Sequence, residues 1–189
     1  MSSQFTAVLD ACVLHSFPLT NLLLHLAEAE LYRARWTADI HEEWIRSVLE
    51  RRPDLTRERL EVRRRAMDES IPDCLVTGYQ SLVRGIELPD ADDRHVVAAA
   101  IRARAAVIVT FNLKDFPDAV LSPFDLAAQH PDAFLHDLID LNPAVIRTRV
   151  EMLLGTYRNP PVTRGAFIAT LEQLGLPGAA AGLRSLFPQ

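Results

Sequence analysis

The chain has few cysteines, and its first residues carry no export signal. Only Cys12 and Cys74 occur among its 189 residues, too few and too far apart for a zinc site or a disulfide framework. Residues 1–6 contain neither a basic stretch nor a small-residue cleavage site, and no apolar run has the length that spans a bilayer. We therefore expect a cytoplasmic protein in a reducing compartment, with Cys12 as a packed thiol.

Several enzyme signatures are missing as well. There is no glycine-rich phosphate loop and no Gly-x-Ser-x-Gly elbow, which argues against P-loop nucleotide hydrolysis and serine hydrolase chemistry. A haloacid-dehalogenase-like phosphatase would carry an aspartate two residues after Asp10, where this chain has Cys12. The six histidines are scattered without pairing, so none is predicted to be a ligand or a general base. A net charge of −5 argues against a wholly basic nucleic-acid binder but leaves room for a local basic patch.

What the chain does contain is the composition of a globular protein, 49% hydrophobic and 24% charged. In residues 1–130, short apolar strands alternate with longer amphipathic helices. The expected strands are 5–9, 35–38 and 106–110. The expected helices are 19–32, 54–67, 74–83 and 93–102, and a further helix begins at its cap Asp39 and ends before Pro53. This alternation predicts an α/β fold with a short parallel sheet and right-handed crossovers.

From residue 131 onward the pattern contains helices alone. They are expected at 131–139, 143–154, 163–174 and 179–186, with a proline-containing linker at 159–161. This part is small for an independent domain and shows no catalytic constellation. We therefore predict two regions, a sheet domain at 1–130 and a C-terminal helical extension at 131–189 that packs on it.

A cluster of aspartates precedes the helix expected at 93–102. Asp90, Asp92 and Asp93 stand within four positions, where their charges repel one another unless they lie in open solvent or a cation compensates them. Capping of the helix explains one of the three. A hard divalent ion would explain the group.

Other oxygen donors are expected to converge on the same place. Asp10 ends the first strand and the loop 112–115 follows the strand at 106–110, and ligands of open parallel sheets bind beyond such strand ends. The helix after residue 39 supplies Glu42 or Glu43, between which periodicity does not decide. Oxygen-only ligands suit Mg²⁺ or Mn²⁺ and disfavour zinc. One or two such ions can lower the pKa of a bound water and orient it for in-line attack on a phosphodiester.

Two further residues are candidates for supporting roles. Thr110 could hydrogen-bond a ligating carboxylate or the attacking water, or it could be an ordinary hydroxyl at a strand end. Lys114 could balance charge or contact a substrate phosphate, or it could be a solvated surface lysine.

An arginine-rich segment follows residue 50 and gives this region a local positive excess. It is either a solvated helix face with intrahelical ion pairs or a surface that contacts an RNA backbone or an acidic partner. The contact candidates are Arg51, Arg52, Arg57, Arg63 and Arg64.

The order of these motifs resembles the PIN domain family, closest to the branch that includes VapC-type toxins. The resemblance covers roughly residues 5–130 and is carried by VLD at 8–10, IHEEW at 40–44, PDADDRHV at 89–96 and VTFNLKDF at 109–116. It implies a three-layer α/β/α fold, metal-dependent cleavage of single-stranded RNA, and often a small cognate antitoxin. It also implies a homodimer, for which the sequence shows no periodic apolar face. The helices after residue 131 resemble extensions found on some toxin-like members.

The resemblance assigns roles residue by residue. Asp10 matches the acid of the first strand, Glu43 matches the helix glutamate better than Glu42, and Asp93 matches the third acid. Asp90 and Asp92 are accessory candidates. Many members have an acid two residues after the threonine, where this chain has Asn112, so Asp115 is expected to substitute for it.

Two functions from different classes follow. The first is a Mg²⁺- or Mn²⁺-dependent endoribonuclease, the toxin of a type II, VapBC-like toxin–antitoxin pair, with RNA and an antitoxin as partners. The second is a PIN-like scaffold with little catalysis that binds RNA or a protein through the arginine-rich segment. Asn112 is the feature that favours the scaffold. A metal-dependent phosphatase acting on a small phosphoester is a weaker third reading.

Overall fold

The computed structural model describes residues 5–187 and has an α/β fold built on one parallel sheet. Its four strands are ordered β2-β1-β3-β4, and every neighbouring pair is parallel. The strands are β1 (Thr6–Leu9), β2 (Arg33–Arg35), β3 (Val107–Val109) and β4 (Ala127–Gln129). All three residues of β3 are buried, as expected for a central strand that helices cover on both faces.

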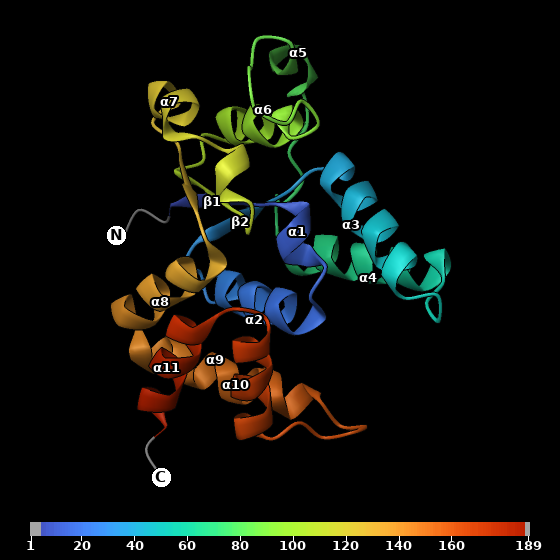
Figure 1. The fold of residues 1–189 in the computed structure, drawn as a ribbon. Coiled ribbons are helices and arrows are strands. Elements are labelled where there is room, and N and C mark those ends of the chain that lie inside the picture. The colour runs from blue at the N-terminus through green and yellow to red at the C-terminus, as the bar shows by residue number, and fades with distance from the viewer. Residues whose placement is uncertain (1–4, 188–189) are drawn as a thin grey trace.

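Helices cover both faces of the sheet. The α-helices are α1 (Ala11–Leu14), α2 (Phe17–Glu28), α3 (Ala38–Arg51), α4 (Arg57–Ser70), α5 (Gln80–Val83), α6 (Arg94–Ala103), α7 (Asp118–Leu121), α8 (Pro131–Leu141), α9 (Pro143–Thr156), α10 (Arg164–Gln173) and α11 (Pro177–Leu186), with 3₁₀ turns η1 (Leu113–Asp115) and η2 (Ser122–Phe124). Helix α6 packs on β1 and β3 and α7 packs on β4, while α2 packs on β2. Figure 1 shows α6 and α7 above the sheet and α2 below it, which gives three layers.

The C-terminal helices form a further layer beneath α2. Helices α9 and α10 both contact α2, and α8 and α11 pack closely against each other (Figure 1). The aromatic ring of Phe134 in α8 lies edge-on to Tyr32, with ring centroids 5.0 Å apart, and edge-on to Phe5 at 6.0 Å. Among residues 5–187, none of the helices combines the length and the apolar character that crossing a membrane demands.

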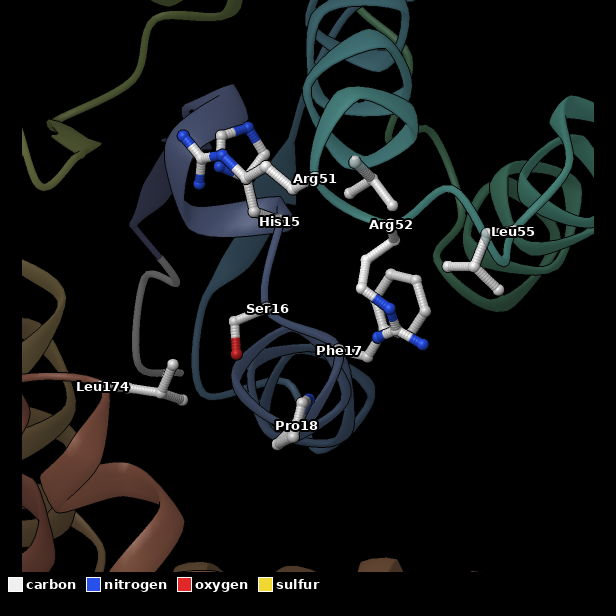
Figure 2. A pocket seen from close by; sticks show the side chains of 9 residues that line it. His15, Ser16, Phe17, Pro18, Arg51, Arg52, Leu55 and Leu174 are labelled. Carbon is white, nitrogen blue, oxygen red and sulfur yellow. The ribbon is translucent and has the colours of Figure 1, made fainter.

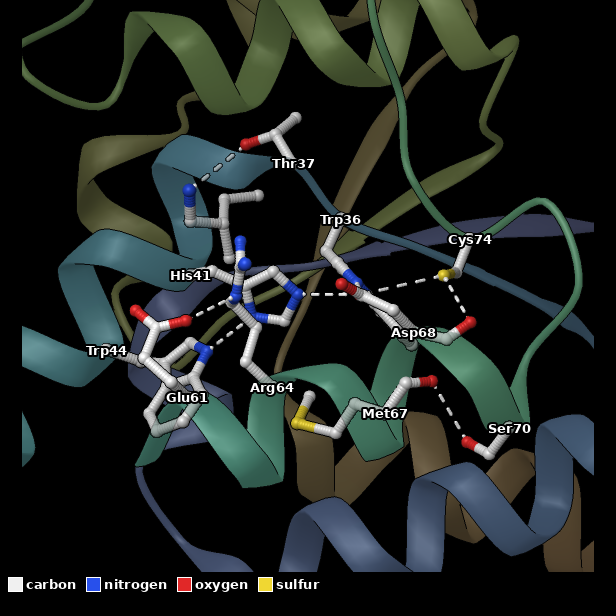
Figure 3. A network of polar contacts seen from close by, with 11 residues as sticks. Trp36, Thr37, His41, Trp44, Glu61, Arg64, Met67, Asp68, Ser70 and Cys74 are labelled. Atoms are coloured by element: carbon white, nitrogen blue, oxygen red, sulfur yellow. Dashed lines mark hydrogen bonds and ion pairs between the residues drawn. The ribbon is translucent and has the colours of Figure 1, made fainter. Parts of the chain in front are cut away.

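A buried polar network joins α4 to α3 and to the residue after β2. His41 is fully buried; Trp44 donates its indole N–H to His41 Nδ1 at 2.8 Å, and His41 Nε2 lies 2.9 Å from Asp68 Oδ1 (Figure 3). Because an indole N–H can only donate, Nδ1 must accept and Nε2 must carry the proton. Trp36 also donates to Asp68 Oδ1, at 2.8 Å. The highly charged α4 is thus attached to the core through Asp68 as well as through Leu60 and Met67, its two buried residues.

Several secondary-structure predictions need correction, among them the helices expected at 19–32 and 54–67, which are α2 (Phe17–Glu28) and α4 (Arg57–Ser70). The helix expected at 74–83 is only α5, because Trp36 N–H donates to the Cys74 carbonyl and Val76 N–H donates to the Trp36 carbonyl, which holds the chain extended there. Strand β2 begins two residues earlier than expected and ends before Trp36. The short helices α1 and α7 and the strand β4 have no counterpart among the predicted elements.

The predicted cap of α3 is also wrong. The N-cap is Thr37, whose side chain accepts from Ile40 N at 3.0 Å, whereas Asp39 lies in the first turn. The Asp39 carboxylate accepts a hydrogen bond from the Tyr79 hydroxyl instead. Burial and this bond to a carboxylate raise the pKa of Tyr79 to about 12, so the hydroxyl stays a donor.

Candidate active site

Asp10 is placed by the end of β1 and is held by three donors. Its backbone N–H continues the sheet by donating to the Val109 carbonyl, and the residue caps α1 by accepting from Ala11 N at 2.7 Å. Its Oδ2 atom accepts from Thr110 Oγ1 at 2.7 Å and from Cys12 Sγ at 3.0 Å. The residue is only 4% exposed. All three donors bond to the same carboxylate and therefore fix its position.

Thr110 and Cys12 form a small polar unit around this carboxylate. The hydrogen bond predicted from Thr110 to a carboxylate is present, and the Thr110 hydroxyl in turn accepts from Asn112 N at 3.0 Å. Cys12 Sγ accepts from Phe111 N at 3.3 Å. Burial, followed by the charge of Asp10, raises the pKa of Cys12 to about 12. Cys12 is therefore a thiol that packs and donates, as expected, and not a nucleophile.

Asp93 faces the same carboxylate from the start of α6. It occupies the N-cap position, but its side chain makes no capping hydrogen bond, so the carboxylate is not committed to the helix. Burial, and then the charges of Asp10, Asp90, Asp115 and Glu43, raise the pKa of Asp93 to about 7. The carboxylates that the sequence predicted to converge are thus close enough to disfavour the ionisation of Asp93.

The structure separates Glu42 from Glu43. Glu42 is exposed and accepts two hydrogen bonds from Arg57 on the outer side of α3. Glu43 is one of the charges that act on Asp93, and its Oε1 lies 3.3 Å from His95 Nε2. Glu43, rather than Glu42, therefore belongs to the group around Asp10.

His95 was not predicted to be near the site. Burial opposes its protonation, but the hydrogen bond to Glu43, followed by the charges of Glu43, Asp39 and Asp10, outweighs burial and raises the pKa of His95. Its Nδ1 atom is buried without a hydrogen-bond partner among residues 5–187. The sequence placed His95 two positions after Asp93, but its partner Glu43 lies on another helix and could not be foreseen.

The fourth side of the site comes from the loop after β3. Asp115 is half-buried in η1 and its charge acts on Asp93, whereas Asn112 and Lys114 are exposed. The two accessory acids, Asp90 and Asp92, are both exposed. The charge of Asp90 also acts on Asp93. Asp90 also accepts from the backbone N–H of Asp92 at 2.9 Å, which closes the turn before α6.

We call Asp10, Glu43, Asp93 and Asp115 the acidic site, and its chemistry fits a hard cation. The four side chains are carboxylates from four separate segments, and the charges of the other three add to burial in raising the pKa of Asp93. In their present positions, no three His, Cys, Asp or Glu side chains among residues 5–187 form a group that could hold a metal ion. Binding an ion would thus require these side chains to draw closer together.

The candidate contact arginines are in different situations. Arg52 pairs with Asp54, Arg57 with Glu42, and Arg64 with Glu61. Arg63 is half-buried: its guanidinium carbon lies 4.0 Å from the centroid of the Phe17 ring, and it donates to Asn21 at 3.1 Å. Arg51 is exposed, and its side chain makes none of the hydrogen bonds or ion pairs found among residues 5–187.

Comparison with known families agrees with this architecture. A family model described as PIN domain matches residues 6–114, more than half of the chain. The chain belongs to the PIN domain family. A second family model, described as VapC50 C-terminal domain, matches residues 131–185 of this PIN protein.

One curated relative has a similar sequence. The chain is 41% identical over 123 residues, which are 63% of this chain and 72% of the relative, to a protein of Mycobacterium tuberculosis (strain ATCC 25618 / H37Rv) described as "Putative ribonuclease VapC50". No solved structure showed a significant match. The resemblance to a VapC-type PIN protein with a C-terminal extension is thereby confirmed.

Proposed function

We propose that this PIN domain is a divalent-metal-dependent endoribonuclease and that it is the toxin of a type II, VapBC-like toxin–antitoxin pair. The observation that carries the proposal is the acidic site, in which a buried, donor-held Asp10 faces Asp93 and the other carboxylates at the end of a parallel sheet. The ribonuclease description of a relative at 41% identity supports the choice of RNA as substrate.

In this proposal, Asp10, Glu43, Asp93 and Asp115 hold one or two Mg²⁺ or Mn²⁺ ions, with Asp90 at the margin. A bound ion of this kind lowers the pKa of water and stabilises the oxygens of a phosphodiester under attack. The cation would also relieve the repulsion that, in addition to burial, raises the pKa of Asp93. The oxygen-rich donor set suits these hard ions better than zinc, since Cys12 keeps its proton.

The remaining residues act on the carboxylates and the substrate. Thr110 and Cys12 fix the Asp10 carboxylate by donating to one of its oxygens, and His95 orients Glu43 from the other side. Lys114 is exposed in the neighbouring loop, where its ammonium group can contact a phosphate of the RNA. Asn112, which has no negative charge, leaves Asp115 as the acid of this loop.

The proposal extends to organisation and partners. Residues 1–130 form the nuclease domain, and residues 131–189 form an extension that stays attached to it, since α9 and α10 contact α2. A small antitoxin is the expected inhibitor, and the protein acts in the cytoplasm. A homodimer is proposed from the family resemblance alone.

The test is cleavage of single-stranded RNA by the full chain after removal of divalent ions with a chelator. We expect cleavage only when Mg²⁺ or Mn²⁺ is added back, and a loss of at least about 100-fold in Asp10→Asn and in Asp93→Asn. Asp140→Asn, a change at a carboxylate that is 70% exposed in α8, is the matched control and should cleave normally. Cleavage without metal, or an active Asp10→Asn variant, would overturn the mechanism.

A further inference from the structure

A cavity outside the acidic site lies where the main domain meets the helical extension. It has a volume of about 380 Å³, within the range of pockets that hold small organic groups. It is formed by the junction of α1 and α2, the end of α3, the loop before α4 and the residue after α10 (Figure 2). The lining residues are His15, Ser16, Phe17, Pro18, Val48, Arg51, Arg52, Leu55 and Leu174. We call this cavity the α1–α2 pocket.

The wall of the α1–α2 pocket presents an aromatic ring that is held in place. Phe17 begins α2, and the guanidinium carbon of Arg63 lies 4.0 Å from its ring centroid. Arg63 is itself fixed by its hydrogen bond to Asn21, and burial lowers its pKa to about 10. A ring restrained in this way loses little freedom when a flat group stacks on it. Val48, Leu55 and Leu174 add apolar surface around it.

The rim of the pocket is positively charged. Arg51 ends α3, Arg52 follows it, and both side chains line the cavity (Figure 2). Arg51 is close enough to His15 for its charge to act on the imidazole. Arg52 forms a solvent-exposed ion pair with Asp54. Arg51 has no such partner among residues 5–187. The pocket therefore combines an apolar interior with an uncompensated cation at its edge.

The pocket lies next to the acidic site. His15 follows the single turn of α1 that begins after Asp10, a rise of about 7 Å along the helix axis. Burial and the charge of Arg51 lower the pKa of His15, while Asp10 and Glu43 oppose them. His15 therefore lies close to Arg51 of the pocket and also to Asp10 and Glu43 of the acidic site. The short separation between Asp10 and His15 would let one RNA strand occupy both the acidic site and the pocket.

We propose that the α1–α2 pocket binds one unstacked base of a single-stranded RNA substrate, which stacks on Phe17 while Arg51 contacts the adjoining phosphate. The inference rests on the proposed function and adds to it a binding position for the substrate. Proteins bind single-stranded nucleic acid through this combination of aromatic platforms and basic side chains, and a base within a duplex is not free to enter. Leu174 lines the same pocket, so the helical extension would also contact the bound base.

The experiment measures binding separately from cleavage. A short fluorescein-labelled single-stranded RNA of mixed sequence is titrated with the full chain in the presence of a chelator, and binding is followed by fluorescence anisotropy. The duplex of the same strand with its complement is the second probe. Phe17→Leu keeps an apolar side chain but removes the stacking face, and Arg51→Ala removes the rim cation. Arg84→Ala, an exposed arginine just after α5, is the matched control.

We expect Phe17→Leu and Arg51→Ala each to weaken binding of the single strand by roughly tenfold, with Arg84→Ala within about twofold of the wild type. The duplex should bind the wild type less tightly than the single strand. Melting temperatures of all variants, measured in parallel, show whether a weaker variant is still folded. A folded Phe17→Tyr, which keeps the stacking face, should retain binding.

Several outcomes would overturn the inference. They are wild-type protein that binds neither probe, pocket variants that bind like the wild type, equal binding of the duplex, and a protein partner that fills the pocket without displacing RNA. The proposed function fails on a different result, the absence of metal-dependent cleavage. Binding that depends on the pocket without cleavage would uphold this inference alone, and cleavage with unaltered binding would uphold the function alone.

Discussion

At the scale of single residues, two aspartates of similar position have opposite surroundings. Asp10 receives hydrogen bonds from Ala11, Thr110 and Cys12, all of which fix its position. Asp93 receives no capping bond and instead faces the charges of other carboxylates, which helps to raise its pKa to about 7. The Asp10 carboxylate is therefore held in position before any ligand arrives, whereas the Asp93 carboxylate gains most when a cation binds.

The hydroxyl of Thr110 should matter for both stability and activity. Thr110→Val removes the donor at 2.7 Å from the buried Asp10 carboxylate, and we expect a loss of about 1.5–3 kcal/mol in the free energy of unfolding. Cleavage should fall by roughly tenfold because the carboxylate loses its fixed orientation. Urea unfolding and RNA cleavage measure the two effects. Thr110→Ser, which keeps the hydroxyl, should recover most of both, and equal losses in the two variants would contradict this role.

A pair of substitutions on one helix tests the choice between adjacent glutamates. Glu43→Gln should reduce cleavage by at least about 100-fold, since even changes around a ligand commonly cost roughly 10–100-fold. Glu42→Gln only weakens an exposed ion pair with Arg57 and should stay within about twofold of the wild type. Initial rates at saturating Mg²⁺ compare the two. The reverse order of effects would move Glu42 into the acidic site.

At the scale of secondary-structure elements, the network around His41 determines how α4 is attached. Burial lowers the pKa of His41 below its ordinary value, although Asp68 opposes this, so the ring is neutral in the folded protein. A proton on Nδ1 would leave two donors, His41 and the indole of Trp44, facing each other at 2.8 Å. The seam between α3 and α4 is thus built for a neutral imidazole.

This predicts a loss of stability in acid. The unfolded chain takes up a proton at an ordinary pKa of about 6.5 while the folded chain does not, so the contribution of His41 is complete above that pH and falls below it. Urea unfolding from about pH 7.5 to about pH 5 should show this decline. His41→Ala should be about 2–4 kcal/mol less stable at the upper end and should decline less steeply. His136→Ala, at a site 48% exposed, should follow the wild-type curve.

The elements and acids that local patterns define were predictable, and those that distant contacts define were not. The central strand β3, the helical extension and Asp10 at a strand end follow from apolar runs and periodicity. The extended chain at Cys74 depends on hydrogen bonds with Trp36, and β4 is short and partly exposed, so neither leaves a local signal. The pairing of His95 with Glu43 joins two helices and was invisible for the same reason.

At the scale of the whole molecule, the helical extension shares its packing with the sheet domain. Asn21 in α2 donates to the Tyr157 hydroxyl at 3.2 Å, and Arg149 lies 3.8 Å from Glu28 at the other end of the same helix. Phe134 completes an aromatic group with Phe5 and Tyr32. Helix α2 is therefore covered on one side by the sheet and on the other by the extension.

Phe134→Ala should therefore destabilise the entire protein. The ring is 1% exposed, and we expect a loss of about 3–5 kcal/mol with one unfolding transition shifted to lower temperature. Met152→Ala, a residue 52% exposed on α9, should change the stability by less than about 0.5 kcal/mol. Calorimetry distinguishes the outcomes. Two separate transitions, of which only one moves, would show that the extension unfolds on its own.

The network of Figure 3 also determines which part of the molecule intrinsic tryptophan fluorescence can monitor. Its only two tryptophans, Trp36 and Trp44, both hydrogen-bond within that network, and the extension contributes Tyr157 but no indole. Intrinsic tryptophan emission therefore monitors the seam between α3, α4 and β2 alone, while far-ultraviolet circular dichroism is dominated by the helices, many of them in the extension. If the two signals change at different denaturant concentrations, the solution contains partly unfolded molecules, in which one region has unfolded and the other is still folded.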